Sequence, residues 1–264
     1  MPRVPASWSL TPQYFLALGF LSGAVGFRIG WRTARPAALP AAQALLGWGV
    51  FLLAWSIVGP AWAAASVGSW ALGTSVAGIY EFARRPKDAD ARVARAASYR
   101  ASMLEILATG RGPETRPGAT LVHHLRETIY YLAAAVLTAN LASLAMGAAL
   151  LNFMNAYVAT LLRAARSTGR VLAFAWPPWS LVRVASYVAL GAAAASPLLG
   201  WAGMHRGGAE VRPLAIAGGC GLVVDTALKL ALSRPWSRVL AAAVDLDAAR
   251  ENRSSEPLVS LDLS

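Results

Sequence analysis

The chain has 264 residues, of which 56% are hydrophobic and only 14% are charged, and its formal net charge is +11. A soluble domain of this length would carry roughly a quarter charged residues, so this composition excludes an ordinary soluble domain. Nucleic-acid binding would need a basic face with interleaved aromatic residues on a soluble fold, and the sequence has no such face. Long uncharged blocks rich in Ala, Leu, Val and Gly instead predict an all-α, polytopic membrane protein.

The first apolar segment, Tyr14–Trp31, is predicted to be a membrane span that the mature protein keeps. Residues 1–12 before it form a short polar leader without the features of a cleaved signal peptide. Two small-xxx-small patterns within the span predict close packing against another helix, although glycine is also common by chance in membrane helices. The glycines concerned are Gly19, Gly23, Gly26 and Gly30.

The apolar block at 41–82 is too long for one span and about right for two. The Gly59-Pro60 pair near its middle predicts a turn, and therefore a helical hairpin of 41–59 and 62–82. Residues 84–126 are predicted to form a basic cytoplasmic loop that contains an amphipathic helix. That helix has two interpretations, lying on anionic lipid headgroups or packing against the rest of the protein.

The block at 128–162 is predicted to be either one long helix or two spans that turn near Met146-Gly147. The next span is predicted at 181–204, and the last one lies within Pro213–Pro235, where Pro235 is expected to end the helix. A polar C-terminal tail, 239–264, follows.

One N-terminal span and three hairpins give about seven transmembrane helices, or six if 128–162 is a single helix. Each hairpin ends in an arginine-rich stop, which predicts that these ends face the cytoplasm. The N-terminus is then outside and the C-terminus cytoplasmic, in a bacterial inner membrane or an organellar membrane. The predicted partners are the bilayer, with its anionic headgroups at the basic loops, and other subunits in a homo- or hetero-oligomer, but no nucleic acid.

The last span carries Asp225 and Lys229, one helical turn apart. Charged side chains inside an apolar span are expensive, and they usually mark a pathway, a proton site or a buried ion pair. At this spacing the two groups can form an ion pair on one helix. Alternatively, Lys229 extends to the cytoplasmic headgroups and Asp225 is merely its partner. Arg183, near the start of the preceding span, is a third candidate for the pathway.

Other chemistry has little support in the sequence. We find no zinc-protease motif, P-loop or dinucleotide-binding glycine pattern, so we predict no catalytic residue and an enzyme is unsupported. Cys220 is the single cysteine, which excludes an internal disulfide and a thiolate metal site. The adjacent His123 and His124 point in different directions on a helix and are interpreted as an interfacial pair. No metal or other cofactor is predicted.

An Asp-x-x-x-Lys pattern in the last of seven helices, here Asp225 and Lys229, resembles the microbial rhodopsins, whose lysine carries retinal. The resemblance extends to the chain length and to Pro197 and Trp201. It fails in the span at 62–82, which has no Arg-x-x-Asp motif, and around Pro197, where alanines replace the aromatic residues of that family. We therefore do not assign the chain to that family.

The sequence thus predicts a transporter or channel-like protein for a small solute or ion, with Asp225, Lys229 and Arg183 at its pathway. The alternative is a non-catalytic accessory subunit that packs into a larger membrane complex through its Gly- and Ala-rich helix faces.

Overall fold

The computed structural model describes residues 11–33, 35–110, 117–204 and 208–251, and these ranges are almost entirely helical. Within them, the only β-type pairing is one isolated antiparallel bridge between Ala165 and Val244. Most of the predicted leader, the end of the predicted tail and His205 lie outside the described residues. So does the side chain of His123.

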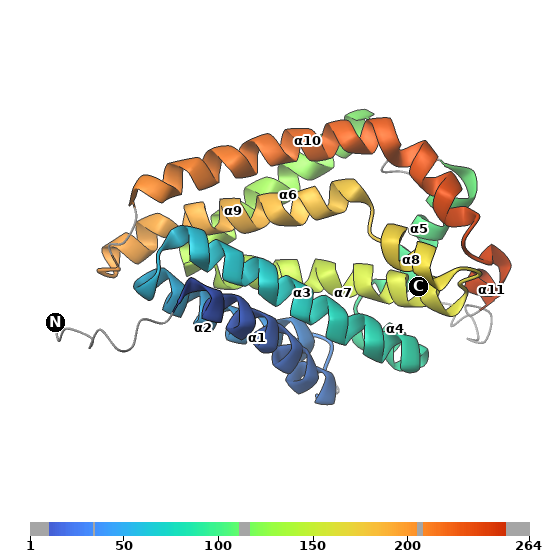
Figure 1. The fold of residues 1–264 in the computed structure, drawn as a ribbon, viewed down its shortest axis with the longest axis horizontal. Coiled ribbons are helices and arrows are strands. Elements are labelled where there is room, and N and C mark those ends of the chain that lie inside the picture. Colours follow the sequence, from blue (N-terminus) through green and yellow to red (C-terminus); the bar gives the residue numbers. More distant parts are fainter. Residues whose placement is uncertain (1–10, 34, 111–116, 205–207, 252–264) are drawn as a thin grey trace, which may run out of the picture.

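Seven of the described helices have 20 residues or more, and Figure 1 shows them side by side. They are α1 (Pro12–Arg32), α2 (Ala38–Ile57), α3 (Pro60–Arg84), α6 (Pro117–Thr138), α7 (Leu141–Arg163), α9 (Pro178–Trp201) and α10 (Gly208–Ala241). The shorter helices are α4 (Pro86–Arg92), α5 (Ala96–Thr109), α8 (Thr168–Phe174) and α11 (Leu246–Glu251). Among the described residues, α1, α2, α7, α9 and α10 are long and apolar enough to cross a membrane, which confirms the predicted class of helical membrane protein.

The long helices form two packed groups. Helices α1, α2 and α3 contact one another and α7 packs against α2 and α3, whereas α9 packs against α6 and α10. The two groups meet where α3 contacts α9 and where α6 contacts α7. Successive long helices run in opposite directions along the long axis of Figure 1, so the C-terminal ends of α1, α3, α7 and α10 meet at one end of the molecule. Each of these four helices has an arginine in its last turn. The basic connectors therefore gather at that same end.

The block at 128–162 contains two helices rather than one, and their junction differs from the predicted position. Helix α6 ends before Ala139 and Asn140, which both adopt left-handed backbone conformations, with φ of 46° and 77°. Asparagine tolerates this conformation better than most residues do. The predicted turn at Met146-Gly147 is wrong, because both residues lie inside α7.

Two further boundaries correct the sequence interpretation. Helix α6 begins at Pro117, inside the predicted loop of 84–126, and proline suits the first position of a helix. Helix α10 continues through Pro213 and Pro235 to Ala241, so the prediction that Pro235 ends the last helix is wrong. In membrane helices, neighbouring groups satisfy the backbone carbonyl that such a proline leaves without a donor. With 34 residues, α10 is about 51 Å long and exceeds the thickness of the hydrocarbon core.

The amphipathic helix predicted within 84–126 is α5, and it packs against the rest of the protein. Met103, Leu104 and Leu107 of α5 are buried in a core that also contains Leu161 of α7 and Leu240 of α10. The structure thus corresponds to the second of the two interpretations for this helix.

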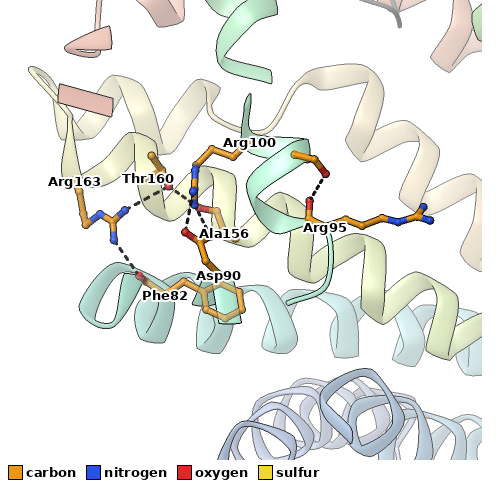
Figure 2. A network of polar contacts seen from close by, with 8 residues as sticks. Phe82, Asp90, Arg95, Arg100, Ala156, Thr160 and Arg163 are labelled. Atoms are coloured by element: carbon orange, nitrogen blue, oxygen red, sulfur yellow. Dashed lines mark hydrogen bonds and ion pairs between the residues drawn. The ribbon is translucent and has the colours of Figure 1, made fainter. Parts of the chain in front are cut away.

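Two neighbouring sets of polar contacts lie where α4 and α5 adjoin the ends of α3 and α7 (Figure 2). Asp90 of α4 accepts two hydrogen bonds from Arg100 of α5, at 2.6 and 2.8 Å. Beside them, Arg163 at the end of α7 donates to the carbonyl oxygen of Phe82 and to Oγ1 of Thr160, both at 3.5 Å. The pair of Asp90 and Arg100 is largely buried, so removing either partner would leave a buried charge without this counter-charge.

The glycines of α1 lie in backbone contact with two different helices. A β-carbon at Gly19 or Gly23 would collide with carbonyl oxygens of α3. At Gly26 it would lie 2.9 Å from Cα of Gln43, and at Gly30 it would lie 2.7 Å from Cα of Leu39, both on α2. The first small-xxx-small pattern therefore faces α3 and the second faces α2.

Acidification is expected to loosen α11. Hydrogen bonds from the backbone N–H groups of Ala248 and Asp247, together with Arg166, hold the pKa of the Asp245 carboxyl below its ordinary value. A carboxyl group whose pKa is lowered by folding stabilises the folded state at pH values above its unfolded-state pKa. This stabilisation is lost as the pH falls below about 4. The protection factor of the Ala249 amide should therefore fall between pH 6 and pH 3. Equal protection at both pH values would show that Asp245 does not hold α11.

Candidate functional site

A cavity of about 410 Å³ lies between α3, α5, α6, α7 and α9. Most of its wall is apolar, with several aromatic side chains. The aromatic residues are Trp70, Tyr99, Tyr131, Phe153, Trp176, Trp179 and Tyr187. Besides the tyrosines, the charged or titratable side chains of the wall are Arg95, His124, Glu127 and Arg183.

Behind this wall, Asp225 of α10 pairs with Arg183 of α9. Nε of Arg183 donates to Oδ2 of Asp225 at 2.9 Å, and Nη2 donates to Oδ1 at 3.1 Å. This bidentate geometry is the strong form of the arginine–carboxylate interaction. The side chain of Asp225 is 0% exposed, whereas that of Arg183 is 22% exposed. Arg183 therefore lies between the buried carboxylate and the cavity.

His124 brings a third helix, α6, to the same carboxylate. Its Nδ1 lies 3.8 Å from Oδ2 of Asp225, which is too long for a hydrogen bond but close enough for an ion pair when the histidine is protonated. His124 was predicted only as part of an interfacial pair, and its position against Asp225 is an addition that the structure provides. Asp225 is thus a meeting point of α6, α9 and α10.

Lys229 lies one turn after Asp225 on α10 and is only 4% exposed. Protein surrounds its side chain, so the interpretation that it extends to the headgroups is wrong. The ion pair between Asp225 and Lys229 stays a prediction. The structure gives the carboxylate a bidentate partner on another helix, Arg183, which the sequence predicts only as a separate pathway candidate.

Small residues allow α9 and α10 to approach closely enough for this pairing. A β-carbon at Gly218 would lie 2.9 Å from the carbonyl oxygen of Ser186, and one at Gly221 would collide with the Ser186 hydroxyl. Gly218, Gly221 and Asp225 recur every three or four residues and so share one face of α10. The close approach of α9 to that face places Arg183 opposite Asp225.

Two tyrosines join α6 to α9 beside the charged groups. The rings of Tyr131 and Tyr187 lie 4.7 Å apart between centroids, and the Tyr187 hydroxyl lies 3.1 Å from Oγ1 of Thr128. Both tyrosines line the cavity. The polar part of the wall is therefore built largely from α6 and α9.

Comparisons of the chain with protein-family models, curated proteins and solved structures find no match. In the described part of the chain, no three His, Cys, Asp or Glu residues lie close enough together to hold a metal ion. What the site offers is an apolar cavity with a hydrogen-bonded charge pair at its wall.

Proposed function

We propose that this protein is an integral membrane transporter that moves a small solute or ion through the cavity beside Arg183. The observation that carries the proposal is the cavity of about 410 Å³, whose wall contains Arg183 and His124 and behind which Asp225 is buried. Ionisable groups within a membrane-embedded bundle are expensive to keep, and they usually face a pathway or a cavity. The proposed pathway residues are Arg183, which lines the cavity, and the buried Asp225 and Lys229, which do not line it.

The proposed topology has seven membrane-crossing helices in a bacterial inner membrane or an organellar membrane, with the N-terminus outside and the C-terminus cytoplasmic. The arginines in the last turns of α1, α3, α7 and α10 lie at one end of the molecule, as the positive-inside rule requires. Helix α3 contacts α1, α2, α7 and α9, so protein rather than lipid surrounds much of it and its Ser and Thr residues are tolerated. Helix α6 directs His124 and Glu127 into the cavity.

Cysteine accessibility tests the proposal without knowledge of the solute. In a Cys220→Ser background, Gly147→Cys places a thiol in the cavity wall, where an added β-carbon meets no atom within 4 Å. Transport requires the cavity to open to both sides in turn. We therefore expect a membrane-impermeant thiol reagent to label this position in right-side-out and in inverted vesicles.

Two matched variants control for orientation. Ala61→Cys, at the start of α3, should react only from outside, and Ala94→Cys, between α4 and α5, only from the cytoplasmic side. Labelling of Gly147→Cys from one side only, or from neither while both controls react, would overturn the transport proposal. A static cavity of that kind would favour the accessory-subunit interpretation.

A further inference from the structure

We propose, building on the transport function above, that the ligand of the cavity is an anionic amphiphile with a carboxylate or phosphate headgroup on a hydrocarbon chain. Arg183 and His124 hold the headgroup, and the chain lies along the apolar wall formed by α7 and α9. The volume of about 410 Å³ falls in the range of roughly 300–1,000 Å³ that is usual for small-molecule sites.

The apolar wall is a continuous strip along one face of α7. Leu144, Gly147, Leu151 and Met154 recur every three or four residues and all line the cavity. Val184 and Val188 of α9 also contribute to the lining. A ligand without a hydrocarbon portion would leave this strip without an apolar partner, so the cavity favours a ligand that carries a chain.

The charges of the wall favour an anionic headgroup. Glu127 is the one carboxylate among the described lining residues, whereas Arg95 and Arg183 are permanently cationic and His124 can be protonated. Asp225 offsets the charge of Arg183 from behind, but its side chain is fully buried and does not line the cavity. A cationic headgroup would therefore meet the guanidinium of Arg183 before it met the carboxylate of Asp225.

The cavity also borders the surface of the helix bundle that would face lipid. Helices α6 and α7 leave the turn at Ala139 and Asn140 in diverging directions (Figure 1). Leu150 of α7 lines the cavity and is nevertheless 45% exposed. An amphiphile dissolved in the bilayer can thus reach the cavity between these helices while its chain stays in an apolar environment.

Tryptophan fluorescence provides the test, because Trp70, Trp176 and Trp179 line the cavity. The full-length protein in a neutral maltoside detergent is titrated with bromine-labelled dodecanoate and, separately, with bromine-labelled dodecyltrimethylammonium. Bromine quenches tryptophans that it contacts. We expect saturable quenching by the anionic probe at a concentration about tenfold lower than for the cationic probe. Dodecyl phosphate should displace the anionic probe, and inorganic phosphate alone should not.

Two glycine variants distinguish binding of the probe in the cavity from unspecific partition of the probe into the micelle. Gly147→Phe fills the cavity, and Gly49→Phe places the same side chain on α2, outside the cavity lining. An added β-carbon meets no atom within 4 Å at either position, so both variants should fold. Gly147→Phe should abolish the saturable quenching by the anionic probe, whereas Gly49→Phe should retain it.

Replacing the charge pair by neutral amides, with Arg183→Gln and Asp225→Asn together, should remove the preference for the anionic probe. Equal or tighter binding of the cationic probe to the parent protein would overturn the inference. So would equal quenching of the two glycine variants, or displacement by inorganic phosphate. Because binding in detergent requires no opening to two sides, this result and the labelling of Gly147→Cys can fail independently.

Discussion

Asp225→Asn is expected to destabilise the protein by about 3–5 kcal/mol, the usual effect of removing one partner from a buried ion pair. The substitution leaves the Arg183 guanidinium, largely enclosed between α9 and α10, without its bidentate counter-charge. Thermal unfolding in detergent, combined with the protease sensitivity of the native state, would measure the loss. Asp247→Asn is a matched control, because the Asp247 side chain is 89% exposed, and its effect should stay within about 0.5 kcal/mol.

Two double variants determine which cation is the partner of Asp225. Adding Arg183→Gln to Asp225→Asn removes the uncompensated charge and should restore most of the lost stability. Adding Lys229→Met instead should restore little, since the bidentate contact is made by Arg183. If the variant lacking Lys229 recovers and the variant lacking Arg183 does not, the ion pair predicted from spacing along α10 is the correct one.

Gly73→Ala is expected to destabilise the packing of α1 against α3 by about 1–3 kcal/mol, or by more if the two helices must separate. The added methyl group would collide with the backbone carbonyl oxygen of Phe20, which cannot rotate away as a side chain would. The measurement is again the unfolding midpoint in detergent.

Gly68→Ala on the same helix is the control with the opposite expected sign. Its β-carbon would meet no atom within 4 Å, so the gain in helix propensity should stabilise the protein by about 0.4–1 kcal/mol. Equal effects of the two substitutions would contradict the close contact between the backbones of α1 and α3.

The class of the protein could be predicted from the sequence because membrane helices are marked by the absence of charge, which is a local property. The positions of the turns were harder to predict from the sequence. Gly147 resembled a turn residue but lies within α7 at the cavity wall, while the turn itself uses Asn140. Proline was similarly misleading, since Pro235, which predicted the end of the last helix, lies inside α10. In an apolar bundle, Gly and Pro often serve packing and kinks rather than chain reversal.

The partners of Asp225 could not be predicted from local spacing, which pairs a residue only with neighbours on its own helix. Arg183 is 42 positions away in the sequence and His124 lies on a third helix. A usable signal did exist. Gly218 and Gly221 precede Asp225 on one face of α10, and such a face predicts the close approach of another helix.

The succession of α9 and α10 in the chain has a consequence for biosynthesis. Placing a lone aspartate at the centre of a membrane helix costs about 2.5–3.5 kcal/mol on insertion scales. Because Arg183 and Asp225 lie on consecutive helices that pack against each other, the two charges can neutralise one another within a single hairpin as it leaves the translocon. His124, made earlier in the chain, would then meet a hairpin whose charges are already paired. Asp225 would enter the bilayer together with its own counter-ion.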